Sequence, residues 1–292
     1  MDILEFKNKY LDDLVLCLGY FDGIHLGHTS LIKRGRELAD KTNSKLAVLI
    51  FTGGKNSDGD IFTYEERLIK LKALNVDVVI YQELNNEFKN TTPYEFLKSI
   101  NTFYSVKVVV CGEDFAYGKN ASGNVEFLKE FMSKNNISVE AVNLVSQNNG
   151  SKVSTRDIKT LLKYGEIVKA NNLLGSNYFI RERVVKGKQK GRELGFPTAN
   201  MVLSKQKMKI KSGVYLTLSI IGGKLYSGIT NVGTQPTFNG EDYILETYFK
   251  GFDGDLYDKV LSVYFVERIR DIKNFNSINE LKEQLNKDLG LL

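Results

Sequence analysis

The two histidines of the chain, His25 and His28, lie in one glycine-rich turn at residues 19–28, with the sequence GYFDGIHLGH. This turn follows an apolar run and opens a segment with helical spacing, so a helix N-terminus there would face a bound phosphate. Imidazole donors at that place would stabilise the charge that builds on phosphate oxygens during attack on an α-phosphate. We therefore predict that both histidines are catalytic. The residues expected to surround the nucleotide phosphate are Gly19, Phe21, Asp22, Gly23 and Gly27.

Two other interpretations of the histidines have less support from the sequence. They could be ordinary polar turn residues. However, a residue type that occurs twice in 292 positions would not then be expected to fall both times in one turn. A zinc site would need further ligands, whereas Cys17 and Cys111 both fall inside apolar, strand-like runs. We expect these cysteines to be buried thiols and not a disulfide.

The first half of the chain alternates between two kinds of segment. Apolar runs typical of buried strands are found at 14–18, 46–51, 76–81, 106–111 and 137–145. Helical spacing is found at 30–40, 64–74, 94–104 and 125–134. This alternation predicts an α/β domain with a doubly wound parallel sheet that is covered on both faces. A second glycine-bounded loop, GEDFAYG at 112–118, should then lie at the same sheet edge as the histidines.

The pattern changes in the second half. Short β-rich runs are separated by turns such as Gly222-Gly223 and Asp253-Gly254, which predicts a small antiparallel barrel. Ser277 and Glu280 form a capping-box pattern ahead of a C-terminal helix. The predicted domains are therefore an α/β domain at 1–152, a helical connector at 153–175 and a β-barrel domain at 176–292.

The second half also carries residues that could handle phosphate. A basic loop, GKQKGR at 187–192, could wrap phosphates through Gly187, Lys188, Gly191 and Arg192, although such loops are also common on solvated surfaces. The run GFPTAN follows at 195–200. If it is extended, Thr198 and Asn200 share one face and could hold Mg²⁺ with its phosphates. The Walker A pattern does not occur, which excludes a P-loop kinase.

These motifs carry a family resemblance. The H-x-G-H turn resembles the signature of the nucleotidyltransferase superfamily, and its longer form resembles the adenylyltransferase module of bacterial bifunctional riboflavin kinase/FAD synthetases. The loop at 112–118 is similar to that family's G-x-D/N-F-x-F/Y-G loop. The GFPTAN run resembles the riboflavin kinase signature, and further landmarks follow in order as far as Arg268-Ile269-Arg270-Asp271. The resemblance therefore covers nearly the whole chain.

The resemblance implies two reactions and several residue roles. The second domain would phosphorylate riboflavin to FMN with Mg-ATP, and the first would adenylylate FMN to FAD and release pyrophosphate. Glu246, which shares a strand face with Ile244 and Tyr248, is implied as the base that removes a proton from the 5′-hydroxyl of riboflavin. The residues implied to contact flavin are Asp114, Phe115, Arg270 and Asp271.

Two departures from the family pattern fall in the first domain. Gly53-Gly54-Lys55 stands where the family usually has Pro-His-Pro. Near the domain end Lys159 replaces an arginine, and Arg156 appears three positions earlier. Lysine offers a point charge in place of a planar fork, so this change is not neutral toward phosphate. We still expect Ser154, Arg156 and Lys159 to contact the nucleotide. In the second domain, Asp258 and Ile272 are milder departures.

Three functional interpretations follow: the bifunctional enzyme, a riboflavin kinase with a weakened or inactive adenylyltransferase domain, and a non-catalytic flavin- or RNA-binding protein. The net charge of +5 suits an anionic substrate without requiring nucleic acid. The sequence shows neither a signal peptide nor an apolar run of membrane-spanning length. We therefore expect a cytoplasmic enzyme that binds ATP, riboflavin and FMN, and neither nucleic acid nor a membrane.

Overall fold

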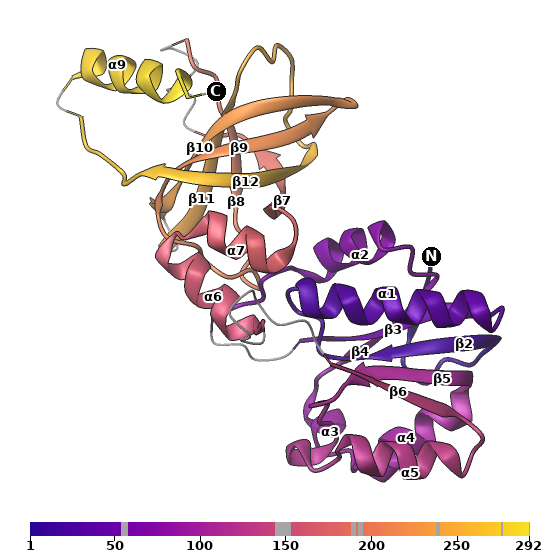
Figure 1. The fold of residues 1–292 in the computed structure, drawn as a ribbon. Coiled ribbons are helices and arrows are strands. Elements are labelled where there is room, and N and C mark those ends of the chain that lie inside the picture. Colours follow the sequence, from indigo (N-terminus) through magenta and orange to yellow (C-terminus); the bar gives the residue numbers. More distant parts are fainter. Residues whose placement is uncertain are drawn as a thin grey trace. The chain divides into compact units, whose positions relative to one another are not determined.

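The computed structural model describes residues 1–53, 58–143, 153–187, 191, 195–237, 240–275 and 277–291 (Figure 1). The chain divides into two compact units. The first contains Met1–Ser57 and Tyr64–Ser154, and the second contains Asp58–Thr63 and Thr155–Leu292. The domain boundaries expected at 152 and 175 stay predictions. No helix in the described part of the chain is long and apolar enough to cross a membrane.

The first unit is built on a six-stranded parallel sheet with the strand order β1-β4-β3-β2-β5-β6. The strands are β1 (Asp2–Glu5), β2 (Tyr10–Leu18), β3 (Lys45–Thr52), β4 (Val78–Glu83), β5 (Tyr104–Gly112) and β6 (Ser138–Val142). The helices are α1 (Leu26–Lys41), α2 (Tyr64–Ala73), α3 (Asn86–Lys89), α4 (Pro93–Phe103) and α5 (Val125–Ser133), with a 3₁₀ turn η1 (Lys119–Ala121). The strands β3 and β4 follow on one side of β2, whereas β5 and β6 follow on its other side. The direction in which strands are added to the sheet therefore reverses between β2 and β5.

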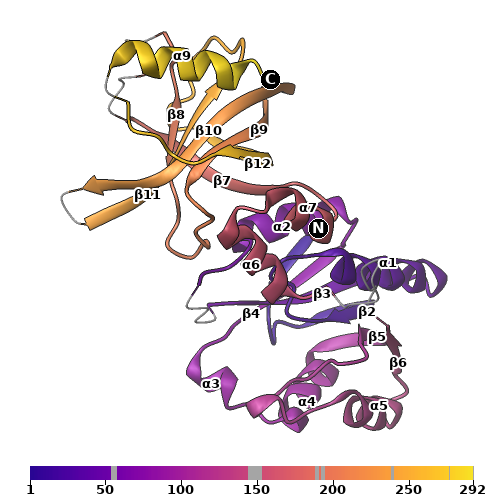
Figure 2. The ribbon, with the colours of Figure 1, turned by 60° about the vertical axis from the view of Figure 1, so that its left-hand side comes forward.

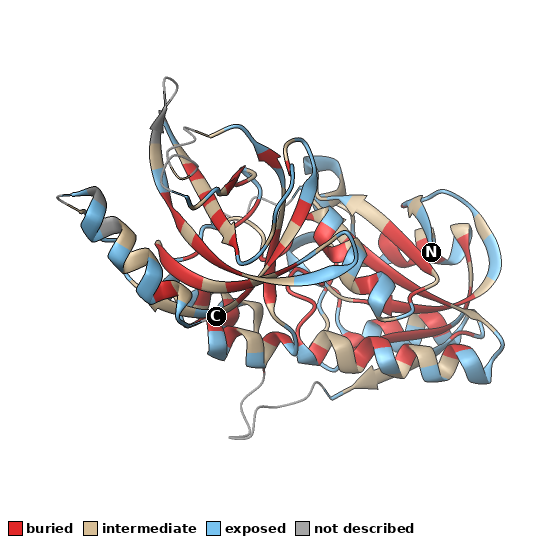
Figure 3. Cartoon of the chain, turned by 90° about the horizontal axis from the view of Figure 1, so that it is seen from above, coloured by how far each residue is buried: buried red, intermediate tan, exposed pale blue. Residues whose placement is uncertain are grey.

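Both faces of this sheet are buried, as the apolar runs predict. Leu14, Leu16 and Leu18 of β2 pack on the side of α4 and α5, whereas Val15 and Cys17 pack on the side of α1 and α2. Successive side chains of a strand point to opposite faces, so an unbroken apolar run serves both layers. Figure 3 shows these strands as largely buried. The predicted doubly wound α/β fold is confirmed.

The second unit is a closed antiparallel barrel with the strand order β10-β11-β8-β7-β12-β9 (Figure 2). Its strands are β7 (Tyr178–Val185), β8 (Ala199–Val202), β9 (Gly213–Ile221), β10 (Lys224–Thr237), β11 (Gly240–Phe249) and β12 (Val260–Arg270). Its helices are α6 (Thr155–Tyr164), α7 (Ile167–Leu174) and α9 (Ile278–Leu289). Ser277 caps α9 and accepts a hydrogen bond from the Glu280 amide, as predicted. The predicted barrel with a terminal helix is confirmed.

Two local features show why this sequence closes a barrel. Gly222 and Gly223 have φ angles of 58° and 80°, the left-handed pair that a two-residue hairpin turn between β9 and β10 requires. Thr217, Thr230 and Thr247 are fully buried on three adjacent strands, and their hydroxyls are joined by hydrogen bonds of 2.8 and 2.9 Å. Because each buried hydroxyl has a partner, this polar row costs little and favours one strand register.

The second unit includes a short segment that lies in sequence between β3 and α2. Phe62 of this segment is fully buried, and its ring centroid lies 5.7 Å from that of Tyr178 and 5.0 Å from that of Phe179. The ammonium group of Lys207 lies 4.7 Å from the centre of the Phe62 ring, within the range of a cation–π interaction. The segment is therefore part of the core of the barrel unit.

Candidate active sites

The histidine turn joins β2 to α1 and is held by burial. Phe21 and Ile24 have φ angles of 49° and 41°, which non-glycine residues adopt only under constraint. Their side chains are 0% and 1% exposed, so the core supplies that constraint. Gly19 leaves room for this packing, because a Cβ atom there would lie 3.0 Å from the Phe21 ring. The turn is thus a rigid support for the helix that it opens.

His25 is the N-cap residue of α1. Its Nδ1 accepts a hydrogen bond of 3.4 Å from the backbone amide of His28, and its ring is 3% exposed. The two imidazole rings stack, with centroids 3.8 Å apart and planes inclined by 19°. Phe21 packs against His28 at 5.0 Å between ring centroids. The structure therefore places both histidines together at a helix N-terminus, where charge on a phosphate is favoured.

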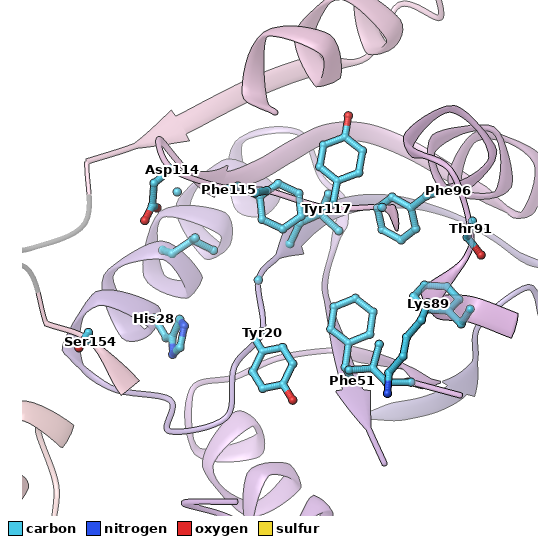
Figure 4. A pocket seen from close by; sticks show the side chains of 18 of the residues that line it. Tyr20, His28, Phe51, Lys89, Thr91, Phe96, Asp114, Phe115, Tyr117 and Ser154 are labelled. Atoms are coloured by element: carbon cyan, nitrogen blue, oxygen red, sulfur yellow. The ribbon is translucent and has the colours of Figure 1, made fainter. Parts of the chain in front are cut away.

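A cavity of about 680 Å³ opens in front of the histidines. It is lined by residues near the end of β3 and by residues that follow β2, β4, β5 and β6, so it lies at the carboxyl edge of the sheet. Figure 4 shows His28, Asp114 and Ser154 on one side of it and Lys89 and Thr91 on the other. The expectation that the loop at 112–118 lies with the histidines is confirmed.

Aromatic side chains form most of the wall between these two sides (Figure 4). The ring centroids of Tyr20 and Phe51 are 6.2 Å apart, and those of Phe115 and Tyr117 are 5.3 Å apart with planes inclined by 15°. Arg67 of α2 is 2% exposed and donates from Nη1 to the carbonyl oxygen of Phe51 at 2.7 Å, which fixes the end of β3. Such a wall suits a planar aromatic ligand.

The structure separates the predicted phosphate contacts of this unit into two groups. Gly19, His25, His28 and Ser154 line the cavity. The predicted contacts that are buried in the turn or helix and are not among the lining residues are Phe21, Asp22, Gly23 and Gly27.

Arg156 and Lys159 lie on α6 and belong to the second unit. Arg156 is exposed, and Lys159 donates from Nζ to the carbonyl oxygen of Gly59 at 2.7 Å. At the other departure, Gly53 has a φ angle of 71°, while Gly54 and Lys55 lie outside the described residues. The roles of Arg156 and Lys159 stay predictions.

Two cavities formed by described residues of the barrel unit share Thr198 and Asn200. One, of about 250 Å³, is lined by Gly187 and by the loop at 252–257. The other, of about 420 Å³, is lined by Glu246, Tyr248 and residues of α9. Asn200 is 9% exposed, and its Nδ2 donates to the carbonyl oxygen and hydroxyl of Thr198 at 3.1 and 3.3 Å. The expectation that these two side chains share a face is confirmed.

Glu246 lies on β11 with its carboxylate in the larger cavity. Its Oε1 accepts a hydrogen bond of 3.0 Å from Nε2 of Gln235 on β10. Gly191 lines the same cavity, whereas Lys188 and Arg192 of the basic loop lie outside the described residues.

The two predicted flavin contacts at the end of β12 and beyond it differ in their surroundings. Arg270 lines the larger cavity, and its guanidinium is bound to Asp288 of α9 by hydrogen bonds of 2.6 to 3.1 Å. Asp271 is 78% exposed, pairs with Arg268, and is not among the lining residues. Asp288 and the apolar residues Leu285 and Leu289 of α9, which the sequence did not single out, line the cavity as well.

Comparison with known proteins covers both units. A family model described as FAD synthetase matches residues 7–157, and one described as riboflavin kinase matches residues 174–291. The bifunctional riboflavin kinase/FMN adenylyltransferase of Bacillus subtilis is 32% identical over 285 residues, covering 94% of this chain and 90% of that protein. The protein of the same name from Haemophilus influenzae is 31% identical and covers 98% and 95%.

The chain belongs to the bifunctional riboflavin kinase/FMN adenylyltransferase family. Both matched domains are catalytic, so it is a transferase with two activities that uses ATP. The resemblance found from the motifs is thereby confirmed. A solved structure described as a macrolide-efflux protein from Streptococcus pneumoniae has a TM-score of 0.89 and 30% identity, covering 100% of this chain and 98% of that one.

The family's flavin chemistry draws attention to residues that the motifs missed. The cavity of the first unit is also lined by Tyr20, Phe51, Phe88, Lys89, Phe96 and Tyr117. Tyr20 lies inside the histidine turn, and Phe51 ends a predicted strand run, so looking at the residues that end each strand would have found both. Phe88 and Lys89 come from the short helix α3, which no motif marks.

Proposed function

We propose that the second unit phosphorylates riboflavin to FMN and that the first unit adenylylates FMN to FAD. The observation that carries this proposal is the pairing of groups within each cavity. In the first unit a helix N-terminus with two histidines faces the same cavity as an aromatic wall. In the second unit the carboxylate of Glu246 shares one cavity with two oxygen-bearing side chains, Thr198 and Asn200, which also line a second cavity.

In the adenylyl transfer, the isoalloxazine ring of FMN packs among Tyr20, Phe51 and Phe115, and the ATP phosphates lie at the N-terminus of α1. An oxygen of the FMN phosphate attacks the α-phosphorus of ATP, the bond to the β-phosphate oxygen breaks, and pyrophosphate leaves with its electrons. His25 and His28 stabilise the charge on the α-phosphate oxygens. The rigid turn keeps the histidines in place, so little reorganisation is needed during the reaction.

In the kinase reaction, the smaller barrel cavity holds ATP and the larger one holds riboflavin. Glu246 takes the proton of the 5′-hydroxyl, the hydroxyl oxygen bonds to the γ-phosphorus, and ADP leaves with the electrons of the bond that breaks. The two substrates meet at Thr198 and Asn200, because both cavities contain these residues. That shared boundary is where the transferred phosphoryl group must pass.

Magnesium fits the same boundary. Because Nδ2 of Asn200 donates to two acceptor oxygens of Thr198, the amide oxygen of Asn200 is not used in these hydrogen bonds and can serve as a hard oxygen ligand. Gly187 provides space next to that oxygen, which a Cβ atom would fill. Thr198 and Asn200 would hold the ion, which neutralises charge on the ATP phosphates when it is bound.

One observation favours a second candidate function, a riboflavin kinase with weak adenylyl transfer. Lys159, which stands where the family usually has arginine, donates to the Gly59 carbonyl within the second unit. A lysine engaged in this way has fewer N–H groups left to donate to a nucleotide phosphate. We rank this candidate second, because the histidines and the aromatic wall are complete without Lys159.

One assay with matched variants separates these functions. Purified protein is incubated with ATP, magnesium and either riboflavin or FMN, and the flavins are resolved by chromatography. We expect His28→Ala to abolish FAD while FMN still forms, and Glu246→Gln to lower FMN formation to a small residual rate while added FMN still gives FAD. FMN that never becomes FAD in the unmodified protein would select the second candidate. No product from either flavin would leave only a binding function.

A further inference from the structure

The proposed base Glu246 is surrounded by uncharged amides. The strand register places it opposite Asn231 of β10 on one side and opposite Asn200 of β8 on the other. Gln235, four residues beyond Asn231 on β10, reaches the same carboxylate and donates from Nε2 to Oε1 at 3.0 Å. All four side chains line the larger barrel cavity.

The hydrogen bond from Gln235 affects which oxygen of the Glu246 carboxylate can accept the substrate proton. Among the residues that the structure describes, Gln235 provides the hydrogen bond to the Glu246 side chain, and it uses Oε1. A base needs one carboxylate oxygen within hydrogen-bond reach of the proton that it removes. With one lone pair of Oε1 engaged by Gln235, Oε2 is the oxygen with the greater capacity to accept from the substrate hydroxyl.

Glutamine suits this task because its amide does not titrate. It donates a hydrogen bond to the carboxylate and cannot take the proton that the carboxylate must accept. An amide–carboxylate bond also restricts the side-chain torsions of a glutamate, which otherwise has considerable rotamer freedom. The hydrogen bond therefore reduces the number of orientations that the Glu246 carboxylate samples, and favours the one that can accept the hydroxyl proton.

We infer that Gln235 is a positioning residue of the kinase step, which holds the carboxylate of Glu246 so that Oε2 faces the 5′-hydroxyl of riboflavin. The inference rests on the proposed role of Glu246 as base. In the reaction the hydroxyl proton passes to Oε2, the hydroxyl oxygen bonds to the γ-phosphorus, and ADP leaves. Gln235 acts through Glu246 alone, so its effect must vanish when Glu246 cannot act.

A double-mutant cycle in the full-length protein tests this inference. Gln235→Met keeps the length of the side chain and removes the donor. We expect the kcat of riboflavin phosphorylation to fall by about 10- to 100-fold, which is the effect of losing a hydrogen bond to a charged group, with the KM for riboflavin nearly unchanged. In a Glu246→Gln background, the same substitution should have no further effect on single-turnover rates.

Two further variants and an internal control complete the test. Gln235→Lys restores a donor to Oε1 but lowers the basicity of Glu246, so it should recover kcat only in part, whereas Gln235→Glu adds a like charge and should be slower than Gln235→Met. Gln206→Met, on an exposed loop of the same unit, should match the unmodified protein. FAD formation from added FMN should stay constant in all of them, which shows that the first unit is folded, and an unchanged KM for riboflavin reports on the barrel unit.

The two possible failures are distinguishable. If Gln235→Met slows the Glu246→Gln protein by the same factor as the unmodified one, or raises only the KM for riboflavin, Gln235 does not act through Glu246 and the inference is wrong. If Glu246→Gln keeps the full kinase rate, the base assignment itself is wrong, whatever Gln235 does.

Discussion

The backbone of Gly187 lies directly against the side-chain amide of Asn200. A Cβ atom at position 187 would lie 2.6 Å from Cγ, 2.7 Å from Oδ1 and 2.8 Å from Nδ2 of Asn200, closer than real Cβ contacts come. Any side chain at 187 must therefore displace the amide that we propose as a magnesium ligand. Glycine is thus required at position 187 because only a residue without a side chain leaves the Asn200 amide in its place.

This contact predicts the effect of Gly187→Ala. The methyl group moves the Asn200 amide out of place, so riboflavin phosphorylation should fall by at least about 10-fold, in line with the large cost of small misplacements at reacting centres. The KM for magnesium should rise in the same variant. FAD formation from added FMN, measured in the same tube, should not change. An unaltered magnesium dependence would contradict the proposed position of the ion.

The aromatic wall of the first unit predicts a selective loss of FMN binding. Phe115→Leu removes a ring that stacks on Tyr117 in the cavity. We expect the KM for FMN in FAD formation to rise by about 2- to 12-fold, which corresponds to the 0.5–1.5 kcal/mol of an aromatic pair. Phe127→Leu is the matched control, because Phe127 is 37% exposed on α5 and is not among the lining residues. A change in the KM for ATP alone would argue against this placement of the flavin.

The ion pair between Arg270 and Asp288 predicts a large effect on stability. Asp288 is 4% exposed in its side chain, so Asp288→Ala leaves a largely buried guanidinium without its partner and should lower the free energy of unfolding by about 3–5 kcal/mol. Asp271→Ala removes an exposed partner of Arg268 and should cost less than about 1 kcal/mol. Urea unfolding followed by circular dichroism measures both. Riboflavin KM values for the same two variants show which carboxylate matters to the cavity.

The cysteines predict protection from alkylation. Burial raises the pKa of Cys111 to about 11 and raises the pKa of Cys17 further, so the reactive thiolate form is rare at pH 8. Because these pKa values lie above the usual range, reactivity should rise only as the pH approaches 11. Iodoacetamide at pH 8, followed by mass spectrometry, should label neither cysteine in the folded protein and both in urea. Labelling of the folded protein at pH 8 would show that the strands open.

The sequence alone predicted the strands that are buried on both faces of the sheet. Runs such as 46–51 are apolar throughout because both faces of β3 are covered, and such runs are recognisable without a structure. The strands β1, β7 and β8 were missed for identifiable reasons. β1 is a mostly exposed edge strand with charged residues, β7 contains three charged residues, and β8 has four residues. Their place in a sheet depends on pairing with distant partners.

The same distinction holds for the candidate sites. His25 and His28 could be predicted because they lie in one local motif whose helix N-terminus gives them a chemical reason. No single motif contains the aromatic wall, since Tyr20 and Phe115 follow β2 and β5 and Phe51 lies near the end of β3, and these segments meet only when the parallel strands align. The hydrogen bond between Gln235 and Glu246 likewise joins two strands, and no spacing in the sequence encodes it.

The segment Asp58–Thr63 lies in the barrel unit although its neighbours in sequence belong to the other unit. The gene therefore does not encode the two units one after the other. Codons 58–63, in its first half, specify part of the barrel core. Exchange of the barrel between relatives by a single recombination crossover near residue 154 would separate Phe62 from Tyr178, Phe179 and Lys207. The packing of the barrel therefore depends on residues from both sides of such a crossover.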